Sequence, residues 1–364
     1  MSERVQLAVV GAGPAGLAVA IEAATRGHSV VVLERQPGAL DKACGEGLMP
    51  AGLAALERLG VLPHLERDDT SPFTSITYVQ DGRRVEGALK APGGLGVRRL
   101  ALSAALRARV AELKVEVRSH CAVRSHERVA GAMRLHTDAG PLDATLLVGA
   151  DGLHSNLRKA EGLEVQSRGP RRFGLRRHVA MAPWAPTVEV HFGDGAEAYV
   201  TPAGRNRVGV AFLWEDGAIS PTVSFEALLQ RFPELAARLA GHPFDSEPRG
   251  AGPLRQVVSW PTSPRLALVG DAAGYVDAIT GEGLSLAFDG AAALGAALND
   301  VLAGDATATS LEPYALAHRR AFERYARLAG TLVWTAHRPA LRRFVVDRLI
   351  AAPKLFEWAL AAAL

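Results

Sequence analysis

A glycine-rich segment near the start of the chain has the residue types and spacing of a dinucleotide-binding loop. It reads GAGPAG over residues 11–16 and follows an apolar run that is typical of a buried strand. Gly11 permits a tight turn, Gly13 has no side chain to keep a pyrophosphate from the backbone, and Gly16 lets a helix pack closely on a sheet. Pro14 suits the first helical turn, and the free N–H groups there favour a bound phosphate.

An acidic residue completes this unit. Glu34 follows a second apolar run, residues 30–33, and stands eighteen positions after Gly16. Its carboxylate would accept hydrogen bonds from a ribose diol, and its charge would repel a 2′-phosphate. The alternative is a glycine-rich turn in another α/β protein. Strand, loop, helix, strand and acid occur in the required order, so the sequence predicts dinucleotide binding.

Two later motifs place an aspartate at the end of an apolar run. Asp271 lies in LVGDAAG at residues 268–274, a motif that an NAD dehydrogenase does not need. In this context its carboxylate could accept a hydrogen bond from a ribityl hydroxyl, which would place the extended part of FAD across the domain. Asp151 lies in GADG at residues 149–152. Its alternative role is a helix N-cap, and both roles could hold together.

The three motifs in this order resemble the flavoprotein aromatic hydroxylase superfamily over about residues 5–300. Many of its members carry an Arg-rich loop where this chain has CGEGL at residues 44–48. They also usually have a Pro and a GxGxN pattern where it has Ala278 and TGEGL at residues 280–284. Both departures resemble the geranylgeranyl reductase-like branch of the superfamily. The resemblance implies FAD as the cofactor and leaves the reaction open.

The resemblance also implies roles at individual positions. Arg99 would pair with the FAD pyrophosphate, with Arg98 as the alternative, and Val123 would meet the adenine with its backbone. Residues 281–283 would start a helix that points at the flavin, and its dipole would stabilise negative charge on reduced flavin. Simple turn geometry and a solvated helix start are the alternatives. The cofactor-binding residues expected are Gly11, Gly13, Ala15, Gly16, Glu34, Arg35, Gly45, Arg99, Val123, Asp151, Asp271, Gly281, Glu282 and Gly283.

Candidate catalytic residues lie in the CGEGL loop, which the resemblance places near the flavin ring. Cys44 could tune or gate flavin reduction, or it is a small buried thiol. Glu46 could relay a proton, or its carboxylate binds backbone amides of its own loop. A flavin performs the electron chemistry itself, and the protein supplies position and electrostatics. No acid–base pair stands out by its spacing in the sequence.

Candidate substrate-binding residues lie in the segment 173–213, which is expected to be all-β. His178, His191 and Tyr199 stand on expected strands there, and those facing inward would line a substrate pocket. The alternative for each is a pocket wall or surface residue without acid–base function. The sequence does not fix which face of the strand each side chain occupies.

Composition excludes several other classes of function. The 364 residues contain 41 Lys and Arg against 38 Asp and Glu, with no dense basic tract, so nucleic acid is not an expected partner. The two cysteines are far apart in the chain, which needs no disulfide framework, and no metal site is expected. The N-terminus enters a strand directly, without a signal peptide, and no uninterrupted apolar stretch reaches eighteen residues. We therefore expect a cytoplasmic protein.

The elements that must position these residues predict an α/β fold. We expect helices at 50–60, 99–112 and 224–240, a hairpin at 74–87, strands near 114–118, 121–126 and 132–137, buried strands that end in a turn at 145–152 and 265–274, and mostly helix from 282 onward. Together they predict a glutathione-reductase-type FAD-binding Rossmann fold with an inserted β-sheet substrate domain and a helical C-terminus. The FAD-binding domain would comprise 1–72, 98–168 and 250–330, the substrate domain 73–97 and 169–249, and the C-terminal helices 331–364.

The segment 331–364 is divided by Pro339 and Pro353 and mixes apolar with basic residues. It would close a hydrophobic tunnel, contact a membrane surface, or pack as a terminal helix pair on the core, which we favour.

These observations predict an FAD-dependent oxidoreductase. The preferred reaction is monooxygenation of an aromatic or polyketide-like small molecule with O₂. NADPH or NADH would be a transient electron donor, because the chain has no second GxGxxG segment. Reduction of isoprenoid or other double bonds is the enzymatic alternative, and a non-catalytic flavin-binding protein is the alternative from another class.

Overall fold

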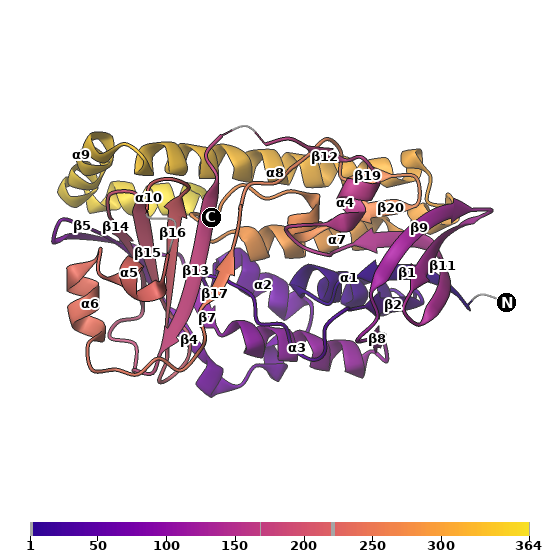
Figure 1. Cartoon of the computed structure of the whole chain (residues 1–364), viewed down its shortest axis with the longest axis horizontal. Helices are drawn as coiled ribbons and strands as arrows, with labels where there is room; N and C mark the ends of the chain where they lie inside the picture. The colour runs from indigo at the N-terminus through magenta and orange to yellow at the C-terminus, as the bar shows by residue number, and fades with distance from the viewer. Residues whose placement is uncertain (1–2, 168, 220–222, 364) are drawn as a thin grey trace.

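The computed structural model describes residues 3–167, 169–219 and 223–363, which form two large β-sheets with helices around them (Figure 1). The strands of the first sheet are β1 (Glu3–Val10), β2 (Val30–Leu33), β8 (Glu116–Arg118), β9 (Val123–Val129), β10 (Ala132–Thr137), β11 (Gly140–Gly149), β19 (Thr262–Ser263) and β20 (Leu266–Leu268). The parallel core runs in the order β20-β11-β1-β2-β8. β19 and the pair β9–β10 extend this core with antiparallel strands.

The parallel core is buried on both faces, as its apolar strands require. Leu7 and Val9 of β1 face one hydrophobic core, and Ala8 between them faces another. The helices over the first face are α1 (Pro14–Thr25), α2 (Pro50–Arg58), α3 (Arg99–Glu112) and α7 (Gly283–Ala303). The short α4 (Asn156–Ala160) lies on the second face, where Leu157 joins the core.

The second sheet has seven strands in the described part of the chain, in the order β17-β13-β16-β15-β14-β5-β6. Their bounds are β5 (Ser75–Gln80), β6 (Arg83–Ala88), β13 (Arg172–Val179), β14 (Thr187–Phe192), β15 (Ala196–Pro202), β16 (Val208–Glu215) and β17 (Arg249–Ala251). β5 and β14 pair in parallel, and the other neighbours are antiparallel. The helices α5 (Phe225–Leu229) and α6 (Pro233–Leu239) share a core with β13, β15 and β16.

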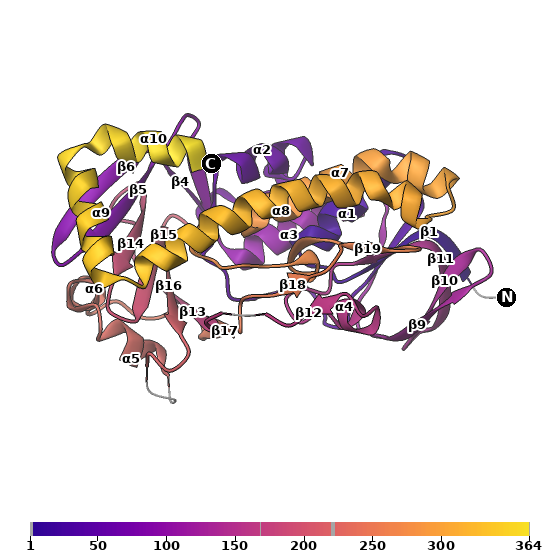
Figure 2. The ribbon, with the colours of Figure 1, turned by 90° about the horizontal axis from the view of Figure 1, so that it is seen from above.

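The C-terminal helices connect the two sheets. They are α8 (Ala308–Ala336), α9 (Pro339–Ala351) and α10 (Pro353–Ala363). α8 runs along the length of the molecule from the first sheet to the second, and α9 and α10 turn back beside β5 and β6 (Figure 2). Val346, Leu349, Phe356 and Leu360 form a core there with Val85 of β6.

Smaller elements complete the chain. They are the strands β3 (Gly47–Leu48), β4 (Thr70–Phe73), β7 (Gly94–Val97), β12 (Glu164–Val165) and β18 (Val257–Val258) and the 3-10 turns η1 (Leu62–His64), η2 (Arg67–Asp69) and η3 (Gly270–Ala273). β3, β7 and β4 form a small sheet in that order, and β12 pairs with β18.

The predicted α/β class with an FAD-type Rossmann sheet, a second sheet and a helical C-terminus is confirmed. The helix expected at 224–240 is divided in two, because Pro233 cannot donate the hydrogen bond that a continuous helix needs and begins a new helix instead. The strand expected from residue 145 begins at Gly140, since its first residues pair with β10. The predicted domain boundaries remain a prediction.

One described helix is long and apolar enough to cross a membrane by length and composition alone. This is α7, and half of its most apolar stretch is buried inside the molecule. Phe288, Leu294 and Leu298 belong to the core beneath the first sheet, so we assign α7 as a core helix.

Candidate functional site

The glycine-rich loop between β1 and α1 forms one side of a deep cavity, and its three glycines have different surroundings. Gly11 has φ +107°, and a Cβ there would lie 2.4 Å from the Ala150 carbonyl oxygen. A Cβ on Gly16 would lie 2.0 Å from the Gly11 carbonyl oxygen. A Cβ on Gly13 would meet no described atom within 4 Å. Gly11 and Gly16 therefore allow close packing, whereas Gly13 leaves the backbone open to a ligand.

Glu34 fixes this loop from the end of β2. One carboxylate oxygen accepts the Ala12 N–H at 2.8 Å, and the other accepts the Gln36 N–H at 2.9 Å. The side chain is buried but still lines the cavity. Each carboxylate oxygen can accept more than one hydrogen bond, so Glu34 keeps the capacity to bind a ribose diol.

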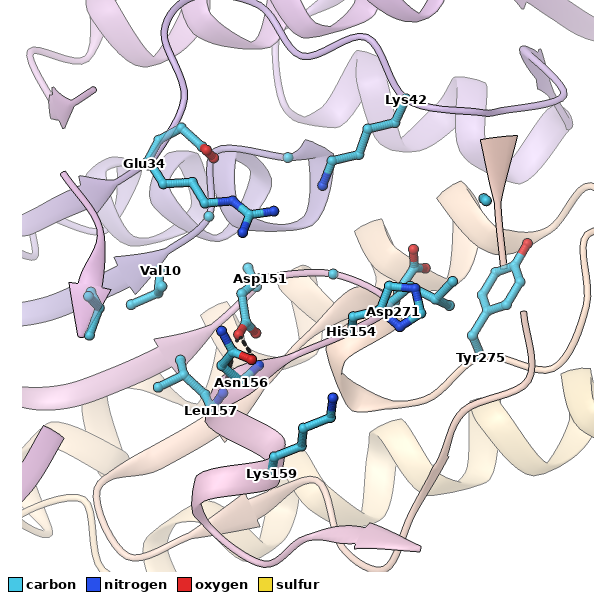
Figure 3. A pocket seen from close by; sticks show the side chains of 18 of the residues that line it. Val10, Glu34, Lys42, Asp151, His154, Asn156, Leu157, Lys159, Asp271 and Tyr275 are labelled. Atoms are coloured by element: carbon cyan, nitrogen blue, oxygen red, sulfur yellow. Dashed lines mark hydrogen bonds between the residues drawn. The ribbon is translucent and has the colours of Figure 1, made fainter. Parts of the chain in front are cut away.

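The cavity has a volume of about 1290 Å³ and extends from Glu34 and Val123 to Asp271. Figure 3 shows Glu34, Lys42, Asp151 and Asp271 around it. The predicted cofactor-binding residues that line it are Gly11, Gly13, Glu34, Arg35, Val123, Asp151 and Asp271. Sequence positions separated by more than 250 residues thus meet around one elongated space.

Asp151 supports the start of α4 and also faces this space. Its Oδ2 accepts the backbone N–H groups of Asn156 at 2.8 Å and Leu157 at 3.2 Å. The N-cap residue of α4 is Ser155 rather than Asp151, so the N-cap alternative is wrong in its position, although Asp151 does bind the first turn of the helix. Its Oδ1 is buried and has no partner among the described residues. That oxygen is available to a donor group of a bound molecule.

Buried Arg158 links the two aspartate motifs. Its guanidinium donates to the carbonyl oxygens of Leu153 at 2.8 Å and Ala272 at 3.2 Å. A single guanidinium group thus connects the turn after Asp151 with the turn η3. Nothing in the sequence pattern alone predicts this contact, because it joins residues more than 100 positions apart.

Asp271 lies in η3 and borders both this cavity and a second one. Burial raises the pKa of its carboxyl, and the nearby cations Arg99, Lys42 and Arg158 oppose that rise. Lys42 and Tyr275 border both cavities as well. The sequence did not single out either residue, because neither belongs to a motif.

The second cavity has a volume of about 470 Å³ and lies between the first cavity, the second sheet and the C-terminal helices. Its walls away from Asp271 are mostly apolar. They include Ile76, Tyr78, Val188, Val190 and Tyr199 from the sheet and Leu328, Leu332, Val345, Leu349, Phe356 and Leu360 from α8, α9 and α10. This placement is compatible with the tunnel-closing alternative for the C-terminal helices. Phe356 and Leu360 also share a core with Val85 of β6, as the favoured packing of a terminal helix pair requires.

The CGEGL loop lies where the two cavities meet, and Cys44, Gly45 and Glu46 all border the second one. The Glu46 N–H donates to Cys44 Sγ at 3.4 Å. Burial raises the pKa of the Cys44 thiol, so this group is protonated near neutral pH. A neutral thiol beside the cavity can donate a proton but is a poor nucleophile.

Glu46 is buried and joins the loop to its surroundings. Its Oε1 accepts the Arg99 backbone N–H at 2.8 Å, and its Oε2 accepts a hydrogen bond from His178 Nε2 at 2.6 Å. Ser246 Oγ lies 2.9 Å from His178 Nδ1 and accepts the His178 backbone N–H, so its own hydroxyl can donate to Nδ1. This assignment leaves the imidazole proton on Nε2, facing Glu46. The predicted binding of a backbone amide is therefore present, although the amide belongs to Arg99 rather than to the loop itself.

Arg99, rather than Arg98, borders the second cavity. Its side chain is buried, and its Nε has no partner among the described residues. This buried N–H is available to an anionic or carbonyl group of a bound molecule.

The start of α7 borders the second cavity as well. Gly281, with φ +70°, and Gly283 border the second cavity, and Ala15 does so from α1. Glu282 borders neither cavity; its Oε1 is buried without a partner in the described chain, and burial raises its pKa to about 7. Any contact between Glu282 and a cofactor would thus use its backbone.

Two histidines expected at the substrate pocket lie elsewhere. Val188 and Val190 of β14 face the cavity, so His191 points to the opposite face, where it binds Glu189 at 2.8 Å. His178 lies behind Glu46 and does not border the cavity. Of the three predicted residues only Tyr199 lines it.

The site fits FAD in its chemistry. The Gly13 backbone is open to a ligand, and Asp151 Oδ1 at the first cavity and Arg99 Nε at the second have no partner in the described chain. The two cavities share Gly13, Lys42 and Asp271 as lining residues. No group of three or more His, Cys, Asp or Glu side chains in the described residues is arranged to hold a metal ion.

Comparison with known proteins decides the family. Residues 4–329 match the FAD binding domain family. The chain belongs to that family. The resemblance to the flavoprotein aromatic hydroxylase superfamily is thereby confirmed, and the chain is an FAD-dependent oxidoreductase.

Its relatives include both reductases and monooxygenases. Menaquinone reductase from Mycolicibacterium smegmatis is 30% identical over 319 residues, covering 78% of this chain and 74% of that one. Kynurenine 3-monooxygenase from Salinispora tropica is 28% identical over 335 residues, covering 79% and 71%. The crystal structure of p-nitrophenol 4-monooxygenase from Pseudomonas putida has a TM-score of 0.83 at 22% identity and covers 99% of this chain and 98% of that one, so the fold is shared along nearly its whole length.

Proposed function

We propose that this flavoprotein is an NAD(P)H-dependent monooxygenase of an apolar, aromatic or polyketide-like small molecule. In this reaction one atom of O₂ enters the substrate and the other leaves as water, while NAD(P)H supplies two electrons and a proton comes from solvent. The observation that carries the proposal is the second, apolar cavity, which adjoins the first cavity at Asp271 and at the CGEGL loop. The likeness to kynurenine 3-monooxygenase supports it.

The chain's own residues bind and orient the reactants. The open backbone at Gly13 and the side chains of Glu34, Arg99 and Asp271 would hold the pyrophosphate, ribose and ribityl parts of FAD. FAD supplies the redox chemistry when bound, including reaction of its reduced form with O₂.

The substrate end of the site works by excluding water. The aliphatic and aromatic walls from β5, β14, α9 and α10 would bury an apolar molecule and gain about 25 cal/mol for each Å² removed from water. Tyr78 and Tyr199 bring hydroxyl groups to the walls, and burial raises the pKa of Tyr78 to about 12. Burial also raises the pKa of Tyr199, so both hydroxyls remain neutral and can donate to a substrate oxygen.

The electron donor would bind only transiently. The chain carries one GAGPAG segment, and the space beside it is assigned to FAD. NADH or NADPH would therefore reduce the flavin from the surface of the cleft and leave before the substrate reacts.

A second candidate is the reduction of a double bond or quinone, in which the substrate gains two electrons and two protons. The neutral Cys44 thiol at the cavity favours this reaction because it can donate a proton. The 30% identity to menaquinone reductase supports it as well.

One experiment separates these reactions. The FAD-loaded protein is reduced by NADH or NADPH without oxygen, mixed with candidate phenols, quinones and polyketides, and then exposed to isotopically labelled O₂ before product mass analysis. Label in the product supports the monooxygenase. A product with two added hydrogens, formed before oxygen is admitted, supports the reductase. A flavin that neither nucleotide reduces would contradict both NAD(P)H-dependent reactions and favour a non-catalytic flavin-binding protein.

A further inference from the structure

Large apolar side chains are exposed on the last helices of the molecule. Six such residues are exposed in the described chain, and four of them lie within residues 334–358. These four, with their exposed fractions, are Trp334 (52%), Phe344 (56%), Leu355 (47%) and Trp358 (69%). The concentration matters, because singly scattered exposed hydrophobic residues need no explanation but a gathered set marks an interaction surface.

α10 shows why this set is not a by-product of core packing. Phe356 and Leu360 are buried against the second sheet and border the apolar cavity. Leu355 and Trp358 stand three residues apart and are exposed, so they share another face of the same helix. A helix that is apolar on two faces needs a second partner besides its own fold.

Basic residues accompany the exposed aromatic rings. The Arg338 guanidinium carbon lies 4.0 Å from the Trp334 ring centroid, and that of Arg348 lies 5.1 Å from the Phe344 centroid. Lys354 is exposed beside Leu355. Long basic side chains that flank aromatic rings are typical of helices at a membrane interface, where the stem is buried and the charge reaches the phosphates.

The charge of this segment is distinctive within the chain. Residues 331–364 contain five basic and two acidic residues, an excess of three, which equals the net charge of +3 for all 364 residues. The remainder of the chain is therefore balanced. Two of the five cations pair outside the segment, Arg342 with Asp194 and Arg343 with Asp81, and Asp347 pairs with Arg83 of β6. The charge that this segment offers to a partner therefore comes from Arg338, Arg348 and Lys354, against Glu357.

We propose that the outer face of α9 and α10, together with the end of α8, docks on an anionic phospholipid surface. In this arrangement Phe344, Leu355 and Trp358 enter the boundary between headgroups and acyl chains. Arg338, Arg348 and Lys354 contact phosphate groups. The inner faces of the same helices wall the apolar cavity through Val345, Leu349, Phe356 and Leu360. Docking would place that wall next to the lipid, whichever redox reaction the cavity serves.

A second copy of the chain fits this face less well. Symmetric pairing of identical surfaces would bring Arg338, Arg348 and Lys354 of both copies together, and like charges would repel. An anionic lipid surface removes that repulsion.

Vesicle co-sedimentation of the full FAD-loaded chain tests the proposal. The vesicles are phosphatidylcholine alone or phosphatidylcholine with phosphatidylglycerol, each at low and high salt. We expect binding to the anionic vesicles, at least about tenfold weaker binding to the neutral ones, and loss with added salt. The variant Arg348→Gln/Lys354→Gln should bind the anionic vesicles about 30-fold more weakly, since each cation near such a surface contributes about fivefold.

The apolar part is tested by Leu355→Ser/Trp358→Ser, with Leu316→Ser on α8 as the matched control, because Leu316 is exposed (39%) outside this segment. The double variant should lose anionic binding while it keeps FAD content and thermal stability, and the control should bind like the wild type. Absence of binding to the anionic vesicles overturns the proposal. So does concentration-dependent dimerisation that the double variant abolishes without any effect on vesicle binding.

Discussion

Gly13 and Gly16 lie three positions apart, at the N-cap and in the first turn of α1. The structure predicts opposite consequences for their replacement by alanine. Gly13 has φ −74° and ψ 175°, an extended conformation that alanine adopts without strain. Its added methyl group would meet no described atom within 4 Å. Gly13→Ala should therefore leave the stability of the FAD-free protein unchanged. The methyl would instead project into the space assigned to the pyrophosphate.

The expected size of the effect follows from the cost of overpacking. An extra methyl in a close-packed contact costs about 1–3 kcal/mol, which corresponds to a Kd for FAD about 5- to 150-fold higher. Gly16→Ala is the matched contrast. Its methyl would lie 2.0 Å from the Gly11 carbonyl oxygen, so the backbone must shift and the fold itself should lose stability. The melting temperature of the FAD-free protein should fall by several degrees in this variant alone.

Fluorescence titration with FAD and thermal unfolding of both FAD-free variants measure these effects. Normal FAD affinity in Gly13→Ala would refute the placement of the pyrophosphate at this loop. Equal loss of stability in both variants would refute the assignment of separate roles to the two glycines.

Three further predictions concern Asp271, Glu46 and Glu282. Asp271→Ala should weaken FAD binding about 10- to 150-fold through loss of a hydrogen bond to a charged group, whereas Asp300→Ala, an exposed acid on α7, should not change it. Glu46→Gln should reduce turnover by about 100-fold or more with FAD content near normal. Both Glu46 oxygens accept from donors, so the Gln amide NH₂ would have to face a donor, either the Arg99 N–H or His178 Nε2. Stopped-flow flavin reduction measures the effect, and wild-type kinetics would assign the role of the loop to its backbone geometry. Burial raises the pKa of Glu282 from 4.5 to about 7, so its neutral form is favoured in the folded state, and this group lowers stability as pH rises through that window. Glu282→Gln should therefore lose less thermal stability than the wild type between about pH 5 and pH 8, and parallel pH profiles would contradict this.

Local chemistry explains which parts of the site could be predicted from the sequence. The turn at Gly11, the acid Glu34 and the turn at Asp271 each need only their immediate neighbours in the chain, and all three border the cofactor cavity. The same holds for Pro339 and Pro353, which begin α9 and α10 as the sequence indicated.

Residues whose roles depend on long-range contacts could not be placed in this way. His191 faces away from the cavity because strand parity is fixed only when β14 pairs with β5 and β15. The hydrogen bond between His178 and Glu46 joins residues 132 positions apart. The apolar walls supplied by Leu349 and Phe356 depend on the path of α8 across both sheets, which no local pattern encodes.

The central claim is that this chain is an FAD-dependent redox enzyme, and an anaerobic titration of the purified, FAD-reconstituted protein with NADH and NADPH tests it most directly. The account predicts one non-covalently bound FAD for each chain and loss of the yellow flavin absorbance with at least one of the two nucleotides, faster when an apolar aromatic substrate is present. A protein that retains no FAD after reconstitution, or whose bound flavin stays oxidised with both nucleotides with and without candidate substrates, would contradict it.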